Sequence, residues 1–392
     1  MTEKSLTTIP AVRVWSDGKS IIFDRKFYDG MLMYMSNWQG SITCIMRSSS
    51  EPLPDFGVVR KLESEIPFGF LLLPEKEKIS YAHLKNSSVV LVAGDSFENF
   101  YISELCQKNK IKCVYTIELI PETRYQINNF QTNNIAVKLR RNFYIWNGER
   151  KRVAAFEKAD GIQANGTAAY EEYKKFKKCL LYFDTRVYRN TIINDQELNR
   201  RLSNLTTQSQ PLRLAFSGRL IKIKGVDHLI TLASSLKSLS VNFHMSIYGS
   251  GDLEAKMRTQ ISDMQVNDQV SMMGAVDFYN ELLPNLKANI DLAVLLHRQG
   301  DPSCTYLETL SCGIPIVGYK NKAFSGLLDR ADIGWGANID DIHGIAKIIE
   351  HINNNRDIIH SKSKNCVDFS SSHDFERTFR KRIEHLSELV AQ

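Results

Sequence analysis

The sequence lacks any apolar run long enough to cross a membrane. The longest runs, such as FGFLLL from Phe68 to Leu73, fall far short of the roughly 20 residues that a spanning helix needs. The opening residues also lack a basic stretch followed by an apolar segment, so we expect a cytoplasmic protein. With 392 residues, 43% of them hydrophobic and 24% charged, the chain is neither disordered nor a single small module. It is long enough for two domains.

Paired cysteines and two common ligand-binding motifs are also missing. The seven cysteines are odd in number and widely spaced, without a CxxC pair, which excludes a disulfide framework and a zinc site. No GxGxxG fingerprint occurs, so the interpretation of this chain as a nicotinamide- or flavin-dependent enzyme lacks its main evidence. No DxD motif follows an expected strand, so we expect no metal.

Positive charge is concentrated in one part of the chain. Residues 101–190 contain 17 Lys and Arg against 9 Asp and Glu, whereas residues 201–392 contain 21 of each. Such a local excess favours encounter with an anionic partner but does not identify it. Nucleic acid, anionic lipid and phosphorylated small molecules all remain open at this point.

Short β-rich runs alternate with segments of helical length, a pattern typical of βαβ units around parallel sheets. The runs of the first half are Val12–Trp15, Ile21–Asp24, Ser41–Met46, Gly69–Leu73, Val89–Asp95, Lys112–Glu118, Gly161–Asn165 and Cys179–Phe183. Those of the second half are Arg213–Gly218, Asn242–Gly249, Val270–Gly274, Ile290–Leu296, Ile314–Tyr319 and Asp332–Trp335.

This alternation predicts an α/β protein with two doubly wound, Rossmann-like domains. The polar stretch from Asn194 to Pro211 is interpreted as the linker between them. We therefore expect an amino-terminal domain over 1–200, a carboxyl-terminal domain over 201–372 and a terminal helix over 373–392 that packs back towards the first domain.

Two cations follow the first strand of the second half. In FSGRLIKIKG, the strand ends at Gly218 and is followed by Arg219 and Lys224. Ligands of open α/β sheets bind at the carboxyl ends of the strands. Two cations there would stabilise a diphosphate whose negative charge grows in the transition state. The alternative is an ordinary strand-to-helix connection with solvated cations.

Glycines end the next two expected strands. Gly249 and Gly251 in YGSGD permit a tight turn and a close approach of backbone to a ligand, and Gly274 ends the VSMMG run. Each of these signals is weak by itself.

The segment HRQGDPSCTYLETLSCGIPIVGY, His297 to Tyr319, is the most informative. A helix is expected to start at Pro302 and Ser303, which would leave backbone amides at its first turn as an anion site. Glu308, one turn further, is placed to reach a hydroxyl pair on the same ligand. Glutamates in helices are most often solvated, but the apolar neighbours of Glu308 favour an enclosed carboxylate that needs partners. The amides expected to be free are those of Cys304, Thr305 and Tyr306.

The order GRL-x3-KG, YGSG and DPSCTYLETLSCGIPIV resembles the carboxyl-terminal domain of family 4 retaining glycosyltransferases (glycosyl transferases group 1). The resemblance implies a GT-B fold, with two Rossmann-like domains facing each other across a cleft. It places Arg219 and Lys224 on the donor diphosphate, Glu308 on the nucleotide ribose and Gly274 at the base pocket. The family's first acid falls at Gly300, so either Asp301 replaces it or backbone holds the sugar. The expected donor-binding residues are Gly218, Gly249, Gly251, Gly274, Gly300, Asp301, Ser303, Cys304, Thr305, Tyr306 and Gly30.

The amino-terminal half carries weaker signals. Gly30 stands where the family has a glycine-rich loop after its first strand, and Asp95, Glu118 and Asn165 are polar residues at expected strand ends. Glu118 is the first choice for a catalytic residue, because the family tends to place a histidine there. A structural or acceptor-binding carboxylate is an equal alternative.

The stretch from Lys138 to Arg152 combines six cations with Phe143, Tyr144 and Trp146. This mixture suits an interfacial helix on anionic lipid at the inner face of the membrane. A helix that packs its aromatics into the core is the alternative. No nucleic-acid module is recognisable, so nucleic acid is not an expected partner.

The resemblance implies a glycosyltransferase that moves a sugar from a nucleotide-diphosphate sugar to a glycan or lipid-linked acceptor in polysaccharide or glycoconjugate synthesis. Retention is implied by the resemblance, with Arg219, Lys224, Glu308 and Glu118 as the catalytic candidates. The nucleotide sugar would be a co-substrate, with no other cofactor. Two alternatives remain: a nucleotide-sugar epimerase on the same fold, and a non-catalytic subunit that binds nucleotide.

Overall fold

A computed structural model describes residues 4–53, 57–132, 134–203, 205 and 210–391. The chain divides into two compact units. The first comprises the residues up to Pro121, Leu139–Phe183 and the residues from Glu376 onward. The second comprises Glu122–Lys138 and Asp184–Phe375.

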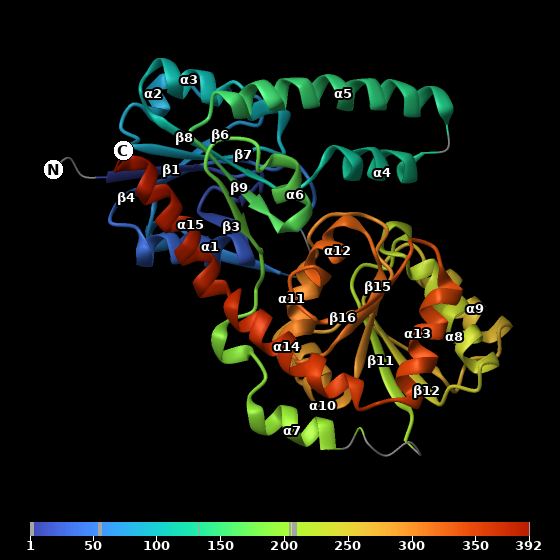
Figure 1. Cartoon of the computed structure of the whole chain (residues 1–392). Helices are drawn as coiled ribbons and strands as arrows, with labels where there is room; N and C mark the ends of the chain where they lie inside the picture. Colours follow the sequence, from blue (N-terminus) through green and yellow to red (C-terminus); the bar gives the residue numbers. More distant parts are fainter. Residues whose placement is uncertain (1–3, 54–56, 133, 204, 206–209, 392) are drawn as a thin grey trace. The chain divides into compact units, whose positions relative to one another are not determined.

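The first unit is built on a parallel sheet of seven strands in the order β10-β9-β8-β7-β1-β4-β6 (Figure 1). Its strands, in chain order, are β1 (Lys4–Ile9), β4 (Gly40–Arg47), β6 (Gly69–Leu73), β7 (Val89–Ala93), β8 (Lys112–Ile117), β9 (Gly161–Asn165) and β10 (Cys179–Tyr182). A separate antiparallel sheet contains β2 (Trp15–Ser16), β3 (Ser20–Asp24) and β5 (Val58–Leu62).

The helices of this unit include a long one and the carboxyl-terminal one. They are α1 (Arg25–Asn37), α2 (Tyr81–Leu84), α3 (Ile102–Lys108), α5 (Ile135–Glu157), α6 (Gly166–Tyr173) and α15 (Phe375–Val390), with 3-10 turns η1 (Glu63–Glu65) and η2 (Phe97–Asn99). The first residues of α5, up to Lys138, belong to the second unit. So does α4 (Pro121–Gln131), except for Pro121.

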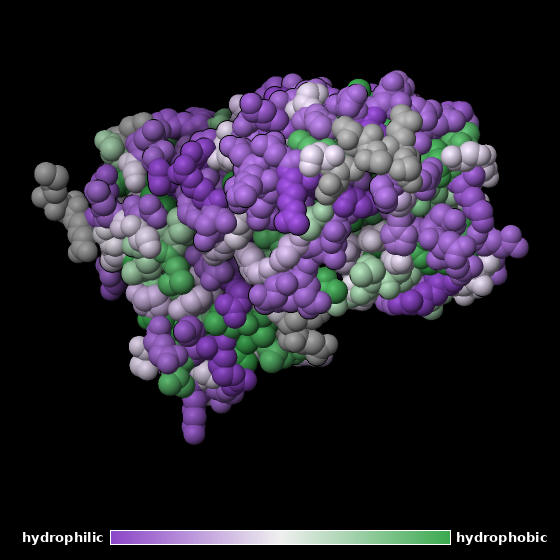
Figure 2. Space-filling view, turned by 90° about the horizontal axis from the view of Figure 1, so that it is seen from below, coloured by the Kyte–Doolittle hydropathy of each residue, from purple (hydrophilic) through white to green (hydrophobic). Residues whose placement is uncertain are grey.

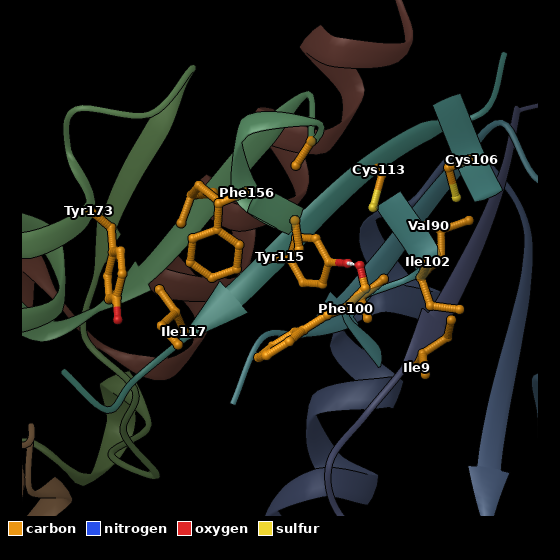
Figure 3. Packing of buried hydrophobic residues seen from close by; sticks show 14 of the residues in the cluster. Ile9, Val90, Phe100, Ile102, Cys106, Cys113, Tyr115, Ile117, Phe156 and Tyr173 are labelled. Carbon is orange, nitrogen blue, oxygen red and sulfur yellow. Dashed lines mark hydrogen bonds between the residues drawn. The ribbon is translucent and has the colours of Figure 1, made fainter. Parts of the chain in front are cut away.

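The core of the first unit lies between the sheet and its helices (Figure 3). Aromatic and branched side chains of β7 and β8 meet those of α3 and the carboxyl-terminal half of α5. Tyr115 is fully buried, and its hydroxyl donates to the carbonyl of Asn99 at 2.9 Å, which satisfies the polar group of this buried side chain.

The second unit contains six parallel strands in the order β13-β12-β11-β14-β15-β16. Helices α8, α9 and α13 lie on one side of this sheet and α10, α11 and α14 on the other (Figure 1). Its strands are β11 (Leu212–Ser217), β12 (Phe243–Tyr248), β13 (Val270–Gly274), β14 (Leu292–Leu295), β15 (Ile316–Tyr319) and β16 (Gly334–Ala337). Its α-helices after α4 are α7 (Asp195–Ser203), α8 (Leu229–Ser238), α9 (Glu254–Asp263), α10 (Leu283–Asn289), α11 (Cys304–Ser311), α12 (Lys322–Leu328), α13 (Ile342–Asn354) and α14 (Ile358–Ser372). Short helical turns are η3 (Arg189–Thr191), η4 (Lys222–Lys224), η5 (Val226–His228) and the π-helical η6 (Phe278–Leu282).

All six strands expected in the second half are present, which confirms the α/β architecture. Their residues are apolar on both faces because helices cover both sides of a parallel sheet. The first half differs more from expectation. Strand β1 is not among the expected runs, although it lies inside its sheet between β7 and β4, and the run Ile21–Asp24 belongs to the antiparallel sheet instead.

The expected linker is wrong over residues 195–203, which form helix α7. Leu198 and Leu202 are buried, and Arg201 donates to the carbonyls of Cys312 and Gly313 at 2.5 Å each. These contacts fix α7 to the second unit. The units instead separate at Phe183 and Asp184, and residues 204 and 206–209 of the expected linker lie outside the described residues.

Candidate functional site

Three glycines at the carboxyl ends of β11, β12 and β13 are joined by backbone hydrogen bonds. The amide of Gly218 donates to the carbonyl of Tyr248 at 3.1 Å, and that of Gly249 to Gly274 at 2.7 Å. Gly249 has a φ of 123°, and a Cβ there would lie 1.9 Å from the carbonyl oxygen of Gly218. Only glycine therefore permits this approach of the strand ends. Gly251 lies beside them, packed on the backbone of Leu220.

The loop after β11 carries the two expected cations in different environments. Arg219 is exposed, and its guanidinium has no partner among the described residues. Lys224 is buried at the end of η4, with 8% of its surface exposed. Gly225, which follows, has a φ of 72°, and a Cβ there would lie 1.8 Å from the carbonyl oxygen of Leu296. The loop thus packs tightly on the end of β14.

A buried arginine holds this loop in place. Arg298 donates from Nη1 to the carbonyl of Lys222 at 2.5 Å and to Asp227 at 2.7 Å, and from Nε to Asp340 at 2.6 Å. Burial would lower the pKa of Arg298, but its two carboxylate partners outweigh burial and raise that pKa above its ordinary value. Arg298 therefore stays charged and fixes the segment that carries Lys224.

His297 lies next to Lys224 in the interior. Neither ring nitrogen of His297 has a hydrogen-bond partner among the described residues, and 1% of the residue is exposed. Burial, with a smaller contribution from the Lys224 charge, lowers the pKa of His297 well below its ordinary value. The neutral ring packs between the rings of Phe216 and Tyr306, at centroid distances of 6.3 and 5.4 Å.

Glu308 of α11 is a buried carboxylate. Only 5% of its side chain is exposed, and its Oε1 accepts a hydrogen bond from Nε of Arg186 at 2.7 Å. The expectation of an enclosed carboxylate with a partner is confirmed. Arg186 itself stacks on the Phe278 ring, with its Cζ 3.8 Å from the ring centroid.

The residues between β14 and α11 are placed as follows. Gly300 is buried beside Lys322 and Thr123, and Asp301 is half-buried with an Oδ1 that has no partner among the described residues. Ser303 is the N-cap of α11 and the half-buried Cys304 and Thr305 are its first residues.

The expectation of a free amide at Tyr306 is wrong. Its N–H donates to the carbonyl of Ser303 at 3.0 Å, and its side chain belongs to the core. The hydroxyl of Tyr306 accepts from Asn321 at 3.0 Å, and its ring stacks on Phe324.

In the first unit, the three expected polar residues do lie together at the ends of β7, β8 and β9. Asp95 accepts from the amide of Glu118 at 3.0 Å, and Glu118 accepts from the side-chain amide of Asn165 at 3.1 Å. The expected glycine-rich loop is wrong, because Gly30 lies inside helix α1. A Cβ there would meet the Phe379 ring of α15 at 2.8 Å, so Gly30 is a packing residue.

Helix α5 presents an exposed apolar stripe. Ile135, Leu139 and Phe143, spaced four residues apart, are 73%, 66% and 67% exposed, and Trp146 is 46% exposed. On the face that Figure 2 shows, by contrast, hydrophilic residues predominate and hydrophobic ones form small groups. No helix of the described residues is long and apolar enough to cross a membrane.

The six cations of α5 differ in exposure. Arg140, Arg141, Arg150 and Lys151 are exposed and Lys138 is half-buried. Arg152 is fully buried and donates from Nε to the carbonyl of Gly94 at 2.9 Å. The prediction that the whole run is interfacial is therefore wrong for Arg152, which anchors the helix to the first unit.

Residues 195–370, with the strand-end loops just described, match the model of the family described as Glycosyl transferases group 1. The matched region is somewhat less than half of the chain. Similar proteins include the amylovoran biosynthesis glycosyltransferase AmsK of Erwinia amylovora, 29% identical over 152 residues, and the N-acetyl-alpha-D-glucosaminyl L-malate synthase of Bacillus anthracis, 23% identical over 125 residues. The alignments cover 36% and 32% of this chain and 35% and 32% of those proteins. They thus span about a third of each relative.

Solved structures resemble the whole chain rather than the group 1 region alone. HepE of Anabaena in complex with UDP has a TM-score of 0.67 at 13% identity and covers 98% of this chain and 100% of its own. WaaG, a glycosyltransferase involved in lipopolysaccharide biosynthesis, has a TM-score of 0.61 at 15% identity and covers 97% and 99%. The GT-B fold is therefore confirmed.

The sequence does not reveal the roles of two further residues at this end of the second unit's sheet, Arg298 and Arg186. Arg298 stands in the informative segment His297 to Tyr319, but nothing in HRQGD indicates that this arginine is buried among carboxylates. Arg186 lies 122 residues before its partner Glu308. No local pattern could have revealed that pair.

Proposed function

We propose that this protein is a retaining glycosyltransferase that moves a sugar from a nucleotide-diphosphate sugar to an acceptor in polysaccharide or glycoconjugate synthesis. The observation that carries the proposal is the group 1 match over residues 195–370, which contains Arg219, Lys224 and Glu308. The UDP complex of HepE and the biosynthetic roles in the names of AmsK and WaaG support it. The first unit would be the acceptor side and the second the donor side.

The strand-end residues have the chemistry that this reaction needs. Arg219 offers an unpaired guanidinium among the described residues, which can form a bidentate contact with phosphate oxygens. Lys224 adds a second positive charge on the same loop, held in place through Arg298. Charge that develops on the leaving diphosphate would be stabilised more in the transition state than in the bound donor. Glu308 would accept hydrogen bonds from the nucleotide ribose.

The remaining donor-side residues have supporting roles in this proposal. Gly218, Gly249, Gly251 and Gly274 would let the donor approach the backbone, with Gly274 at the base pocket. Gly300, Asp301, Ser303, Cys304 and Thr305 would line the place of the donor sugar and diphosphate. Glu118 would act on the acceptor side, although its bonds to Asp95 and Asn165 also suit a structural carboxylate.

A donor-release assay tests the activity. A panel of nucleotide sugars is first screened for thermal stabilisation of the protein, and the stabilising donors are then incubated with and without glycan and lipid-linked acceptors. We expect release of nucleoside diphosphate. An epimerised sugar would support the epimerase alternative, and binding without turnover would support a non-catalytic subunit.

Substitution of the cations connects the activity to this site. Arg219→Ala should lower kcat by roughly 10²-fold, the scale for losing one transition-state donor. The exposed Arg258 of α9, which pairs with Glu254, is the matched control, and Arg258→Ala should leave kcat unchanged. Turnover near the wild-type value in Arg219→Ala would refute the assignment.

We further propose that the exposed stripe of α5 docks on anionic lipid at the cytoplasmic face of the membrane, where a lipid-linked acceptor would be found. Apolar side chains can enter the interface while Arg140, Arg141, Arg150 and Lys151 meet lipid phosphates. Each basic residue near such a surface contributes about 1 kcal/mol. The resulting binding should be reversible and sensitive to salt.

Vesicle sedimentation tests the docking. Wild-type protein should sediment with phosphatidylglycerol-containing vesicles, remain in solution with phosphatidylcholine alone, and be released when salt reduces the Debye length from about 8 Å to about 3 Å. The double variant Phe143→Ser/Trp146→Ser should bind at least about tenfold more weakly. Tyr81→Ser, at an aromatic residue of the first unit that is as exposed as Trp146, is the control. Equal sedimentation of both variants would exclude α5 as the docking element.

A further inference from the structure

Arg186 lies outside the family-matched region, yet it contacts two elements within that region, α11 and η6. It follows β10 in the segment where the second unit begins. Its Nε donates to Glu308 of α11, its guanidinium lies on the ring of Phe278, and its backbone carbonyl accepts from the hydroxyl of Tyr279 at 2.9 Å. Arg186 is thus held from α11 on one side and from η6 on the other.

The ion pair leaves one carboxylate oxygen of Glu308 available. Oε1 accepts from Arg186, whereas Oε2 has no hydrogen-bond partner among the described residues. A carboxylate that is anchored through one oxygen cannot rotate freely, so the direction of the other oxygen is also set. An acceptor fixed in this way loses little conformational entropy when a hydroxyl binds to it.

The surroundings explain why a buried carboxylate tolerates this arrangement. Glu308 has 5% of its side chain exposed, and a charge so buried is stable only with a charged partner. Arg186 has 42% of its side chain exposed. Burial opposes its charge, but Glu308 outweighs that effect and raises the pKa of Arg186 above its ordinary value. The cation therefore remains charged next to Glu308.

We propose that Arg186 is a positioning residue, which orients Glu308 so that its free oxygen accepts hydrogen bonds from the ribose hydroxyls of the donor. This protein therefore selects ribonucleotide donors through the Arg186–Glu308 pair. This inference rests on the proposed function, because it requires a nucleoside diphosphate at this edge. Arg186 acts through Glu308 and not through a bond of its own to the nucleotide.

Calorimetry with nucleotides tests the inference without an acceptor. UDP, ADP and GDP are titrated into the wild-type protein, and the tightest of them is compared with its 2′-deoxy and 3′-deoxy forms. The wild type should prefer the ribonucleotide by about 10-fold or more, as expected for hydrogen bonds to a charged group. In Arg186→Met this preference should fall below about 3-fold, and Arg186→Lys should restore part of it.

A double-mutant cycle separates positioning from direct contact. Arg186→Met should weaken binding of the ribonucleotide by about 10-fold in the wild-type background and by less than about 2-fold in Glu308→Gln, because its effect passes through the carboxylate. In turnover, Arg186→Met should raise KM more than it lowers kcat. Arg200→Met, at an exposed arginine of α7 in the same unit, is the matched control and should bind like the wild type.

The outcomes distinguish this inference from the proposed function. Equal losses from Arg186→Met in both backgrounds would mean a direct contact and would overturn the positioning role. An unchanged preference for the ribonucleotide in Arg186→Met would overturn the inference while leaving the proposed function intact. Folded wild-type protein that binds none of the three diphosphates would overturn the proposed function, and this inference with it.

Discussion

Gly225 offers a quantitative test of how the cation loop is built. Gly225 and Gly274 have nearly the same φ, 72° and 75°, so an alanine at either position should carry a similar left-handed backbone cost of about 1–2 kcal/mol. Their surroundings differ. A Cβ at Gly225 would lie 1.8 Å from the carbonyl oxygen of Leu296, whereas no atom lies within 4 Å of a Cβ at Gly274.

The comparison therefore isolates the steric contact with β14. Since Leu296 is fully buried, its carbonyl can move only if the strand end shifts, and such overpacking costs about 1–3 kcal/mol more. Gly225→Ala should lower the free energy of unfolding by about 2–5 kcal/mol and Gly274→Ala by about 1–2 kcal/mol.

Urea denaturation at equilibrium, followed by far-UV circular dichroism, measures both values. The midpoint should fall further for Gly225→Ala than for Gly274→Ala while the slope stays the same. Equal destabilisation of the two variants, within about 0.5 kcal/mol, would show that the loop does not press on β14 and would refute the reasoning.

Two further predictions concern buried groups of the same unit. Arg298→Leu should lower the free energy of unfolding by about 3–5 kcal/mol, because it leaves Asp227 without its buried partner, and urea denaturation checks this value; a loss below about 1 kcal/mol would mean that the ion pair is solvated. His297 has a pKa below its ordinary 6.5, so the unfolded chain binds a proton more readily and stability should fall as pH drops below about 6.5. A phenylalanine at position 297 fits between the rings of Phe216 and Tyr306 and cannot bind a proton. In His297→Phe the free energy of unfolding should therefore fall by about 1.4 kcal/mol less between pH 7.5 and 5.5 than in the wild type. The same pH dependence of the free energy of unfolding in variant and wild type would contradict this.

The sequence alone determined the sheet of the second unit and the position of its loops. Apolar runs and glycines are local signals, and parallel strands place all their carboxyl ends at one edge, so the order of residues was enough to group Gly218, Gly249 and Gly274. The start of α11 at Ser303 and the enclosure of Glu308 followed from its neighbours in the chain.

Only the tertiary structure decided which polar groups pair and how the units are composed. Strand β1 lies inside its sheet, flanked by β4 and β7, although KSLTTI is only weakly apolar. Glu122–Lys138 and Arg186 belong to the second unit, and Arg298 meets Asp340 from 42 residues away. Such contacts form between distant parts of the chain that fold against each other, so the composition of a short segment cannot predict them.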